Sequence, residues 1–414
     1  MIAPNILAIV LAGGEGSRLR PLTEHRSKPS VPFGGRYRIV DFALSNLVNS
    51  KIFSIYLLVQ YKSQSLIEHI RRSWVMASNF PEQFIAVVPP QMHEGPEWFR
   101  GTANAVYQNL ALIEQHAPDL VVVFSADHIY RMDVRQMVDF HMGSGADVTV
   151  AALPVPIGLA SEFGIIDAAP DGAIRGFREK PVDPAPMPKD PTHAFASMGN
   201  YLFKTDVLIN ALRESHRLGE MDFGKGILPH LVQTKRVYAY DFSENRIPGI
   251  RDYEERGYWR DVGTIDAYFE AHQDLLGAEP KFDMFNPKWR IGSSNYQGPS
   301  PKFFRAEMDN SIISSGCLIK GARLRNSIVR SEVLMEEDVE LDECIVMDYV
   351  VLRKGVRLKR VIVDRYNTIE AGESIGYEAD ADRRRFAVTD SGIVVVRRGQ
   401  DTDTRADEVM SRYL

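Results

Sequence analysis

The sequence predicts an α/β domain with a mostly parallel, Rossmann-like sheet, followed by a parallel β-helix. Short apolar runs alternate with amphipathic segments over residues 6–153, which is typical of strands and helices that pack into a parallel sheet. A proline-rich passage covers residues 280–301, and beyond it apolar residues recur every 16 or 17 positions. A chain of 414 residues is also too long for one typical core. We therefore expect a first domain over residues 1–279, a linker over 280–300 and a second domain over 301–414.

Strands and helices alternate in the first domain. Apolar runs predict strands at residues 6–11, 55–59, 120–124 and 148–153. Amphipathic spacing predicts helices at residues 41–49, 63–72, 102–114 and 134–142. Ligands of such sheets bind at the carboxyl ends of the strands, where the loop before Lys28 and the pair Ala126-Asp127 both fall. The prolines between residues 181 and 191 predict a surface loop.

An internal period marks the second domain. The repeating apolar residues form two series, Ile312, Ile328, Ile345 and Ile362, and Leu318, Leu334 and Val351 with Thr368 next in register. The two series are six residues apart, which suits a coil with three flat faces, each contributing one inward side chain to a stacked core. A β-sandwich with evenly spaced strands is the alternative. The six-residue step favours the coil and resembles the left-handed parallel β-helix of hexapeptide repeats, although regular glycines are missing at several turns.

Composition excludes several classes of protein. The chain is 44% apolar and 25% charged with a net charge of −6, which does not suit a general nucleic-acid surface. Its two cysteines, Cys317 and Cys344, form no C-x-x-C motif, so neither a disulfide scaffold nor a zinc site is indicated. No segment approaches the roughly 20 apolar residues of a membrane span, and the first residues lack the features of a signal peptide. We expect a cytoplasmic protein that binds neither membrane nor nucleic acid.

The most informative motif is the glycine-rich segment after the first predicted strand. It reads Leu11-Ala-Gly-Gly-Glu-Gly-Ser-Arg-Leu-Arg-Pro-Leu-Thr23 and leads to Lys28-Pro29. Glycines expose backbone N–H groups that can surround phosphate oxygens, and Arg18 and Lys28 add positive charge beside them. A dinucleotide fingerprint would need glycine where Leu19 stands, and the P-loop motif is absent. An ordinary glycine turn is the alternative.

The whole segment, with its arginine, Pro-Leu-Thr and Lys-Pro, resembles the sugar-1-phosphate nucleotidyltransferases. Within that family the chain is most similar to bacterial enzymes that adenylylate glucose 1-phosphate, and the similarity extends over nearly its whole length. The resemblance implies transfer of an adenylyl group from ATP to α-D-glucose 1-phosphate, which gives ADP-glucose and pyrophosphate for glycogen synthesis. It also implies Mg²⁺, a sugar-phosphate activator and a homotetramer. Such a transfer brings two polyanions together, so catalysis depends on charge neutralisation and alignment.

Two aspartates are candidate metal ligands. Asp127 lies in Phe124-Ser-Ala-Asp-His-Ile-Tyr130, just after a predicted buried strand, where an acidic residue either caps a helix or binds metal. Asp261 lies in Tyr258-Trp-Arg-Asp-Val-Gly-Thr264, and a surface ion pair with Arg260 at a helix start is its alternative. The family resemblance implies that both carboxylates hold catalytic Mg²⁺, while Arg18 and Lys28 bind the triphosphate. Ala126 stands where the family has glycine.

Further segments resemble the family's binding sites for the sugar phosphate and the nucleotide. For the sugar phosphate, these are Glu179 and Lys180 in Phe177-Arg-Glu-Lys-Pro181, together with Gly164 and Ser197. An isolated Glu-Lys pair is more commonly solvated surface. For the nucleotide, the candidates are Leu11, Ala12, Gly13, Gly14, Gln60, Phe99, Gly101 and Thr102. Phe99 and Asn104 replace the family's usual tyrosine and aspartate, which removes a hydroxyl and a charge near the nucleotide. We interpret His25 and His128 as structural, because an ionised phosphate nucleophile needs no proton shuttle.

Basic residues outside these motifs are candidates for an effector site. Arg36 ends the segment Phe33-Gly-Gly-Arg36. In relatives, a lysine at the position of Arg36 contributes to the regulatory cleft. An arginine can bind a phosphate through two hydrogen bonds, and Arg383, Arg384 and Arg385 could form the opposite wall. A solvated charge cluster is an equally good interpretation of that run. Glu114-Gln115 stands where some relatives have two basic residues implicated in AMP inhibition, so we expect weak inhibition by AMP.

Two other functions are compatible with the motifs. A thymidylyl-, uridylyl- or guanylyltransferase that uses dTTP, UTP or GTP would share the glycine loop, but the segments 41–46 and 258–264 resemble the adenylyl branch. A non-catalytic regulatory subunit of the same fold typically loses charges from its active site. This chain retains them at Arg18, Lys28, Asp127, Lys180 and Asp261.

Overall fold

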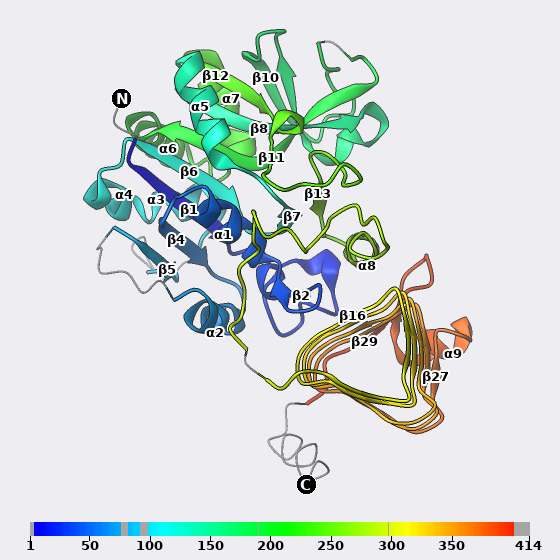
Figure 1. Cartoon of the computed structure of the whole chain (residues 1–414). Helices are drawn as coiled ribbons and strands as arrows, with labels where there is room; N and C mark the ends of the chain where they lie inside the picture. Colours follow the sequence, from blue (N-terminus) through cyan, green and yellow to red (C-terminus); the bar gives the residue numbers. More distant parts are fainter. Residues whose placement is uncertain (1–3, 76–81, 92–97, 189, 297, 401–414) are drawn as a thin grey trace.

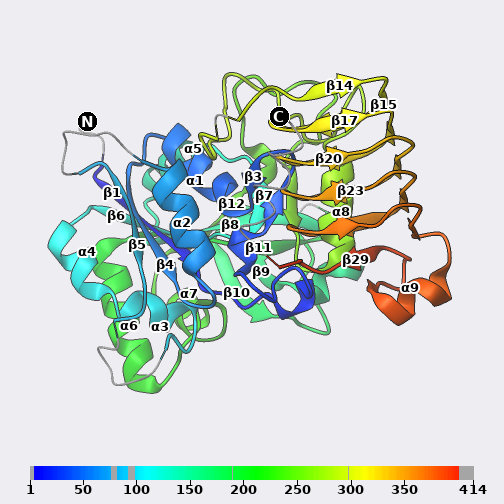
Figure 2. The ribbon, with the colours of Figure 1, turned by 90° about the horizontal axis from the view of Figure 1, so that it is seen from below.

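The computed structural model describes residues 4–75, 82–91, 98–188, 190–296 and 298–400. An α/β unit, coloured blue to green in Figure 1, contains the earlier part of the chain, and a triangular β-helix, yellow to red, lies against one side of it. Figure 2 shows the coils of the β-helix stacked beside the α/β unit. Within the described ranges, no helix is both long enough and apolar enough to cross a membrane.

Among the described residues, nine strands form the sheet of the α/β unit. The main path is β10–β9–β11–β6–β1–β4–β5, and β8 joins it beside β11 with β12 at its other edge. The bounds are β1 (Ile6–Ala12), β4 (Ser54–Val59), β5 (Phe84–Val88), β6 (Leu120–Ser125), β8 (Val148–Pro156), β9 (Gly164–Ala168), β10 (Ile174–Glu179), β11 (His193–Lys204) and β12 (Val237–Asp241). The four predicted strands are therefore confirmed. The sheet is mixed, because β6, β1, β4 and β5 pair in parallel whereas β11 is antiparallel to β6, β8 and β9.

Helices cover the two faces of this sheet. They are α1 (Val40–Asn49), α2 (Gln64–Ser73), α3 (Thr102–Tyr107), α4 (Leu110–His116), α5 (Val134–Ser144), α6 (Thr205–Leu218) and α7 (Leu228–Thr234), whereas α8 (Ile265–Gln273) packs against the β-helix in a separate core. The single helix predicted at residues 102–114 was wrong, because α3 and α4 are separate. At the break the Asn109 side chain donates to the carbonyl of Ala105 at 2.8 Å, an acceptor that a continuous helix would use for backbone bonding.

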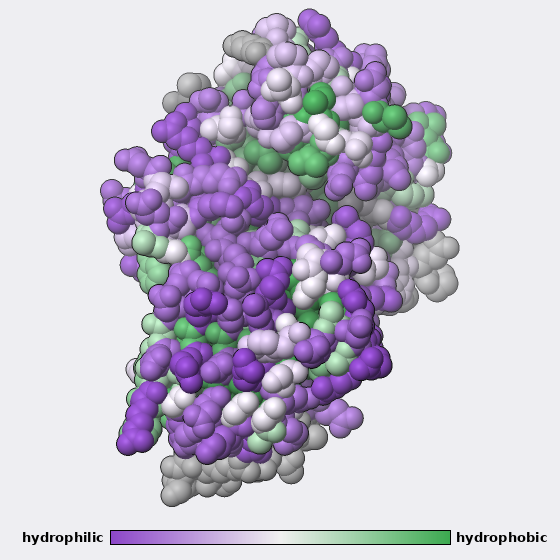
Figure 3. Space-filling view, turned by 90° about the vertical axis from the view of Figure 1, so that its right-hand side faces the viewer, coloured by the Kyte–Doolittle hydropathy of each residue, from purple (hydrophilic) through white to green (hydrophobic). Residues whose placement is uncertain are grey.

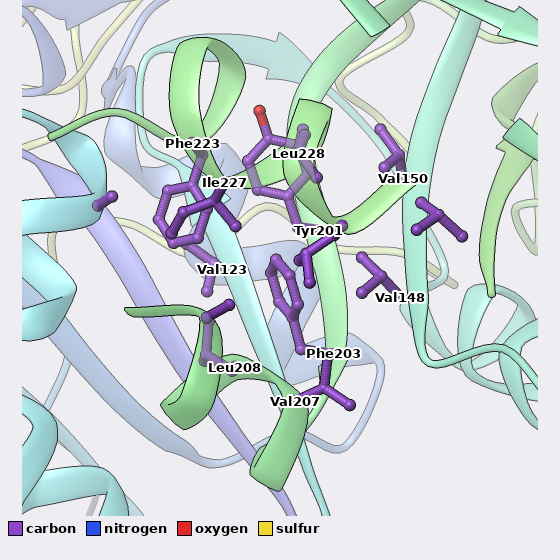
Figure 4. Close-up of a cluster of buried hydrophobic side chains, with 14 of the residues drawn as sticks. Val123, Val148, Val150, Tyr201, Phe203, Val207, Leu208, Phe223, Ile227 and Leu228 are labelled. Atoms are coloured by element: carbon purple, nitrogen blue, oxygen red, sulfur yellow. The ribbon is translucent and has the colours of Figure 1, made fainter. Parts of the chain in front are cut away.

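Strand β1 is apolar throughout because both faces of the sheet are covered. Leu7 and Ile9 belong to the core beneath α3, α6 and α7, while Ala8 and Val10 belong to the core beneath α1, α2 and α5. Figure 4 shows the first of these cores, where Phe203 of β11 packs near Leu208 of α6. The buried layers fix the sheet, and polar segments at the strand ends are left for ligands.

Residues 302–396 form a β-helix of three sheets, whose strands pair in parallel except for one antiparallel strand at the edge of the third sheet. The first sheet contains β14 (Lys302–Phe304), β17 (Leu318–Lys320), β20 (Leu334–Met335), β23 (Val351–Leu352) and β26 (Thr368–Ile369). The second contains β15 (Glu307–Asp309), β18 (Arg323–Arg325), β21 (Glu340–Asp342), β24 (Arg357–Lys359) and β27 (Ser374–Ile375). The third contains β16 (Ile312–Ile313), β19 (Ile328–Val329), β22 (Ile345–Val346), β25 (Val361–Val363), β29 (Val394–Val396) and β28 (Ala387–Val388), with α9 (Ala379–Arg385) inserted before β28.

The predicted register of the β-helix is confirmed, but the predicted direction of the side chains was wrong. Ile312, Ile328, Ile345 and Ile362 are partners from coil to coil, as are Leu318, Leu334, Val351 and Thr368. Ile328, Ile345 and Ile362 nevertheless point outward and pack against the α/β unit. The inward core uses the following residues of each strand, such as Val329, Val346 and Val363. Successive side chains of a strand alternate faces, so the period alone did not say which of two adjacent apolar residues lies inside.

The corners of the β-helix explain the missing glycines. At successive turns Asn310, Asn326, Glu343 and Arg360 have positive φ values between 42° and 54°. Such values are uncommon without glycine, and asparagine is one of the residues that tolerates them. The turn geometry repeats although the residue type does not.

Charged side chains on the second sheet pair from one coil to the next. Arg325 lies 2.7 Å from Asp342, and Arg357 lies 3.1 Å from Glu340. The space-filling view in Figure 3, which shows the right-hand side of Figure 1, is largely hydrophilic with small apolar patches between polar rows. Exposed ion pairs of this kind contribute little each to stability.

Candidate active site

The glycine-rich segment leaves β1 at the rim of a hollow. Ala12 is buried, whereas Leu11, Gly13 and Gly14 line the hollow. Gly16 has a φ of 67°, and a Cβ atom there would lie 2.8 Å from the Cβ of Lys28. Because a real contact is not that short, glycine at this position lets the loop pack against the segment that carries Lys28.

Lys28 is the centre of the site. It begins the short 3₁₀ turn η2 (Lys28–Ser30), and its side chain is only 8% exposed. Its Nζ donates to Asp127 Oδ2 at 3.0 Å and to Asp261 Oδ1 at 2.7 Å. Burial alone lowers the pKa of Lys28, but the charges of Asp127 and Asp261 outweigh burial and raise the pKa above its usual value. Lys28 is therefore positively charged and held between two carboxylates.

Two short strands bring those carboxylates together. β7 (His128–Tyr130) follows β6 closely in the chain. β13 (Trp259–Asp261) pairs with β7, so that Asp261 lies opposite His128. Asp127 precedes a strand, so it is not the helix cap that was its alternative. Asp261 faces Lys28, whereas Arg260 pairs with Glu255 and Asp274, so the proposed Arg260–Asp261 surface pair is absent from the described residues.

The chemistry of this cluster suits a hard divalent cation. Ligand atoms of Asp127, His128 and Asp261 all lie within 4.8 Å of one another. Burial raises the pKa of Asp127, but the neighbouring His128 and Lys28 and a hydrogen bond from Ser125 outweigh burial and lower the pKa well below its usual range. Two ionised carboxylates with oxygen donors are the ligands that Mg²⁺ prefers. His128, which was predicted to be structural, packs against Trp259, and their ring centroids are 4.6 Å apart.

Arg18 completes the charged part of the site. Its Nη2 lies 3.8 Å from Asp261 Oδ2, and its side chain is 65% exposed. Arg18, Lys28, Asp127 and Asp261 all line the same hollow of about 620 Å³. The structure therefore brings the four predicted catalytic residues together from segments that are far apart in sequence.

The predicted nucleotide segments form one wall of the hollow. Gln60, Phe99, Gly101 and Thr102 all line it. The Gln60 side chain accepts from the Phe99 backbone N–H at 2.5 Å and donates to the Phe99 carbonyl at 3.1 Å. A Cβ atom on Gly101 would lie 2.1 Å from the carbonyl oxygen of Met221, which only glycine avoids. These contacts fix the backbone at the start of α3.

Asn104 does not face this wall, contrary to the expectation that it alters the charge near a nucleotide. Its side chain is buried, and its oxygen accepts from the Arg100 backbone N–H and from the Gln108 side chain, both at 3.0 Å. Asn104 therefore supports the first turn of α3 from within.

The opposite wall contains most of the predicted sugar-phosphate segments. Gly164, Glu179 and Ser197 line the hollow. A Cβ atom on Gly164 would lie 2.8 Å from Glu179 Oε2, so the absence of a side chain leaves room for this carboxylate. Lys180 directly follows Glu179, but its side chain is exposed and is not among the residues that line the hollow.

Sequence reasoning missed several lining residues, among them Tyr201, Trp259 and Asp222. Tyr201 and Trp259 line the hollow and belong to segments that were already singled out, although they were not chosen as candidates. Asp222 was not singled out at all. Its carboxylate accepts from the Thr102 hydroxyl at 2.8 Å and from the Gly224 backbone N–H at 2.9 Å. The signal that could have revealed it is an aspartate followed by Phe-Gly, which is typical of an N-cap before a tight helical turn.

A second hollow lies between the α/β unit and the β-helix and has a volume of about 650 Å³. Its lining residues include Arg36, Arg38, Arg72, Arg330 and Arg365. Burial and the nearby charge of Arg365 lower the pKa of Arg38 to about 9. The concentration of guanidinium groups favours an anionic ligand.

The predicted opposite wall of this hollow was wrong. Arg383, Arg384 and Arg385 lie on α9, which Figures 1 and 2 place at the outer side of the β-helix, away from β2 (Pro32–Phe33) and β3 (Tyr37–Arg38). They do not line the hollow that contains Arg36. Arg385 pairs instead with Glu373, and Arg383 with Asp380. The positive wall opposite Arg36 comes from Arg330 and Arg365, because the coils of the β-helix present those positions to the α/β unit.

Comparison with known proteins places both halves of the chain. The nucleotidyl transferase family model matches residues 7–277, and a model of the GlmU-like C-terminal hexapeptide matches residues 300–396. A glucose-1-phosphate adenylyltransferase of Thermodesulfovibrio yellowstonii is 57% identical over 95% of this chain and 96% of its own length. Proteins of the same name from Anaeromyxobacter sp. and Anaeromyxobacter dehalogenans are 46% and 49% identical, over 94% and 95% of this chain and 97% and 98% of their own lengths.

Proposed function

This chain belongs to the glucose-1-phosphate adenylyltransferase family, and we propose that it transfers an adenylyl group from ATP to α-D-glucose 1-phosphate. The products are ADP-glucose and pyrophosphate, and the pathway served is the synthesis of glycogen or a related α-glucan. The observation that carries the proposal is the cluster of Lys28, Asp127 and Asp261 at the carboxyl ends of β1 and β6, beside a glycine loop. This is the position at which α/β sheets bind their ligands.

The reaction requires a phosphate oxygen of glucose 1-phosphate to attack the α-phosphorus of ATP in line with the leaving pyrophosphate. One P–O bond forms to the sugar phosphate, and the bond between the α- and β-phosphates breaks. Lys28 and Arg18 place positive charge where the triphosphate gains negative charge in the transition state. The backbone N–H groups of Gly13 and Gly14 add further donors, and Glu179 and Ser197 orient the sugar phosphate from the wall of the hollow. The exposed Lys180 directly follows Glu179 in the chain.

The residues present fit a divalent metal, and we assign it as Mg²⁺. Asp127 and Asp261 would hold the ion, and their oxygen atoms suit it. When bound, Mg²⁺ supplies Lewis-acid neutralisation of phosphate charge. Lys28 contacts the same two carboxylates, and its positive charge reduces the repulsion between them.

Nucleotide preference tests the proposal. We expect kcat/KM for ATP to exceed that for dTTP, UTP and GTP by at least about tenfold, each measured with glucose 1-phosphate and Mg²⁺. The motivation is the match of almost the whole chain to adenylyltransferases, since no single base-reading residue is evident. Equal or better efficiency with dTTP would overturn the assignment, and no turnover with any of the four would favour a non-catalytic subunit.

The same family membership supports a regulatory and assembly role for the second domain, which contains the β-helix. A sugar-phosphate activator would bind the second hollow through Arg36 together with Arg330 and Arg365, rather than through α9. Activation by fructose 6-phosphate and fructose 1,6-bisphosphate should be measured in the wild type and in Arg36→Ala, with Arg384→Ala on α9 as the matched control. We expect Arg36→Ala to weaken activation and Arg384→Ala to leave it unchanged. Undiminished activation in Arg36→Ala would remove Arg36 from the effector site.

A further inference from the structure

The segment that carries Lys28 lies between the active site and the β-helix. From η2 the chain runs directly into β2, turns through Gly34, Gly35 and Arg36, and returns as β3. Lys28 is therefore only a few residues from a hairpin that packs on the other half of the molecule. A displacement of the hairpin has little chain length in which to be absorbed before it reaches Lys28.

Arg330 of the β-helix binds the turn of this hairpin. Its Nη1 donates to the carbonyl oxygens of Phe33 at 3.2 Å, Gly34 at 3.0 Å and Tyr37 at 3.0 Å. The side chain of Arg330 is 6% exposed, and its Nε lies 3.2 Å from both carboxylate oxygens of Asp348. One buried guanidinium thus fixes both strands of the hairpin to a rigid coil.

A second contact holds the chain on the other side of Lys28. Arg26 donates through Nε to the Leu22 carbonyl at 2.9 Å and forms a buried ion pair with Asp364 of the β-helix. Ser314, also of the β-helix, donates to the carbonyl of Gly35 at 2.7 Å. The β-helix therefore binds the backbone or side chains on both flanks of Lys28.

Packing alone does not require an arginine at this interface. The α/β unit and the β-helix already share an apolar core that includes Phe33 and Ile345. A buried charge is costly unless it is fully paired, and apolar replacements at such positions are commonly as stable or more stable. Arg330 instead fixes the position of the hairpin relative to the β-helix, because it donates hydrogen bonds to three of its carbonyl groups.

We propose that Arg330 is a positioning residue that holds Lys28 at the two active-site carboxylates. The proposal rests on the proposed function, because Lys28 acts on the triphosphate in that reaction. A displacement of about 1 Å can cost about a hundredfold in rate when a catalytic group must be aligned. A displacement of that size would also break the Lys28 hydrogen bonds, which measure 2.7 Å and 3.0 Å.

A double-mutant cycle tests this inference. Arg330→Ala should lower kcat by about tenfold or more, with a change of less than about twofold in KM for glucose 1-phosphate, since the sugar-phosphate wall does not touch the hairpin. In a Lys28→Ala background the same Arg330→Ala change should alter kcat by less than about twofold, because the group that it positions is gone. Arg325→Ala is the matched control, since Arg325 pairs with Asp342 on the exposed second sheet, and it should leave kcat unchanged in both backgrounds.

The outcomes separate the two claims. An equal loss from Arg330→Ala in both backgrounds would overturn the positioning role, because the effect would then not pass through Lys28. If Arg330→Ala fails to fold by circular dichroism, Arg330→Lys, which keeps a charge beside Asp348 but lacks the planar fork, should show the same non-additivity with a smaller loss. Failure of both variants to fold would also overturn it. A wild-type chain that forms no ADP-glucose would instead contradict the proposed function.

Discussion

At the scale of single residues, the active site depends on one lysine that neutralises two aspartates. The motifs predicted Lys28, Asp127 and Asp261 separately, and the fold joins them within hydrogen-bonding distance. Because these residues come from η2, from the turn after β6 and from β13, no segment of the chain could have shown this contact by itself. Asp127 is thereby kept ionised and ready for a cation.

We predict that Asp127→Asn keeps the fold but lowers turnover by roughly a thousandfold, because a neutral amide cannot neutralise the positive charge of Mg²⁺. Turnover at saturating Mg²⁺ is the measurement, with thermal unfolding to verify the fold. Asp147→Asn is the matched control, since Asp147 pairs with Lys204 and Arg236 outside the site and should not affect turnover. Near-normal turnover of the Asp127 variant would exclude it as a metal ligand.

At the scale of elements, α8 connects the second metal segment to the hairpin after Lys28. It follows Asp261 closely in the chain and begins with Thr264 as its N-cap. Its His272 accepts a hydrogen bond at Nε2 from the Gly34 backbone N–H at 3.0 Å and donates through Nδ1 to the Tyr268 carbonyl at 2.8 Å. Nε2 can accept this bond only while the histidine is neutral. Burial lowers the pKa of His272 to about 3.

We predict that this histidine makes the protein less stable as pH falls below about 6.5. Above the unfolded pKa of about 6.5 His272 is neutral in both states and contributes no pH dependence. Below that value the unfolded chain binds a proton that the folded chain excludes until pH about 3, so unfolding is favoured. The loss of unfolding free energy reaches about 2 kcal/mol at pH 5 from this group alone.

The measurement is the midpoint of thermal unfolding of the wild type and of His272→Gln between pH 7.5 and pH 5. We expect the variant to be less stable at pH 7.5 but to lose less on acidification. His141→Gln serves as a comparison, because burial lowers the pKa of His141 to about 4, which also lies below pH 5, so this group should give an effect of similar size in the same direction over this range. Parallel pH profiles of wild type and His272→Gln would show that His272 does not titrate with unfolding.

At the scale of the whole molecule, the β-helix is part of the core of the α/β unit rather than an appendage. Ile328, Ile345 and Ile362 pack with Phe33 and Tyr268 in one buried cluster. A buried ion pair between Arg26 and Asp364 joins the two parts across the same interface. The two halves therefore stabilise each other, and the segment with Lys28 lies where they meet.

We predict that a chain of residues 1–300 is poorly soluble and unfolds at a lower temperature than the intact protein. Its exposed interface would lose about 1.5–3 kcal/mol for each large apolar side chain that is no longer buried. We also expect light scattering to show that the intact chain is a homotetramer and the shortened chain is not. A well-folded, soluble shortened chain would contradict the shared core, and a monomeric intact chain would contradict the assembly role of the β-helix.

The sequence by itself determined the local features of this protein. Periodicity predicted the strands of the α/β unit and the coil register of the β-helix, because burial on one or two faces imposes those periods. Resemblance supplied the chemistry of Arg18, Lys28, Asp127 and Asp261. Only the tertiary structure decided which of two adjacent apolar residues, such as Ile345 or Val346, lies inside a coil, since both are apolar and both are buried. It also decided that Arg330 rather than α9 lies across from Arg36, because which coil face meets the α/β unit depends on packing between segments about 300 residues apart, a property that no local pattern encodes.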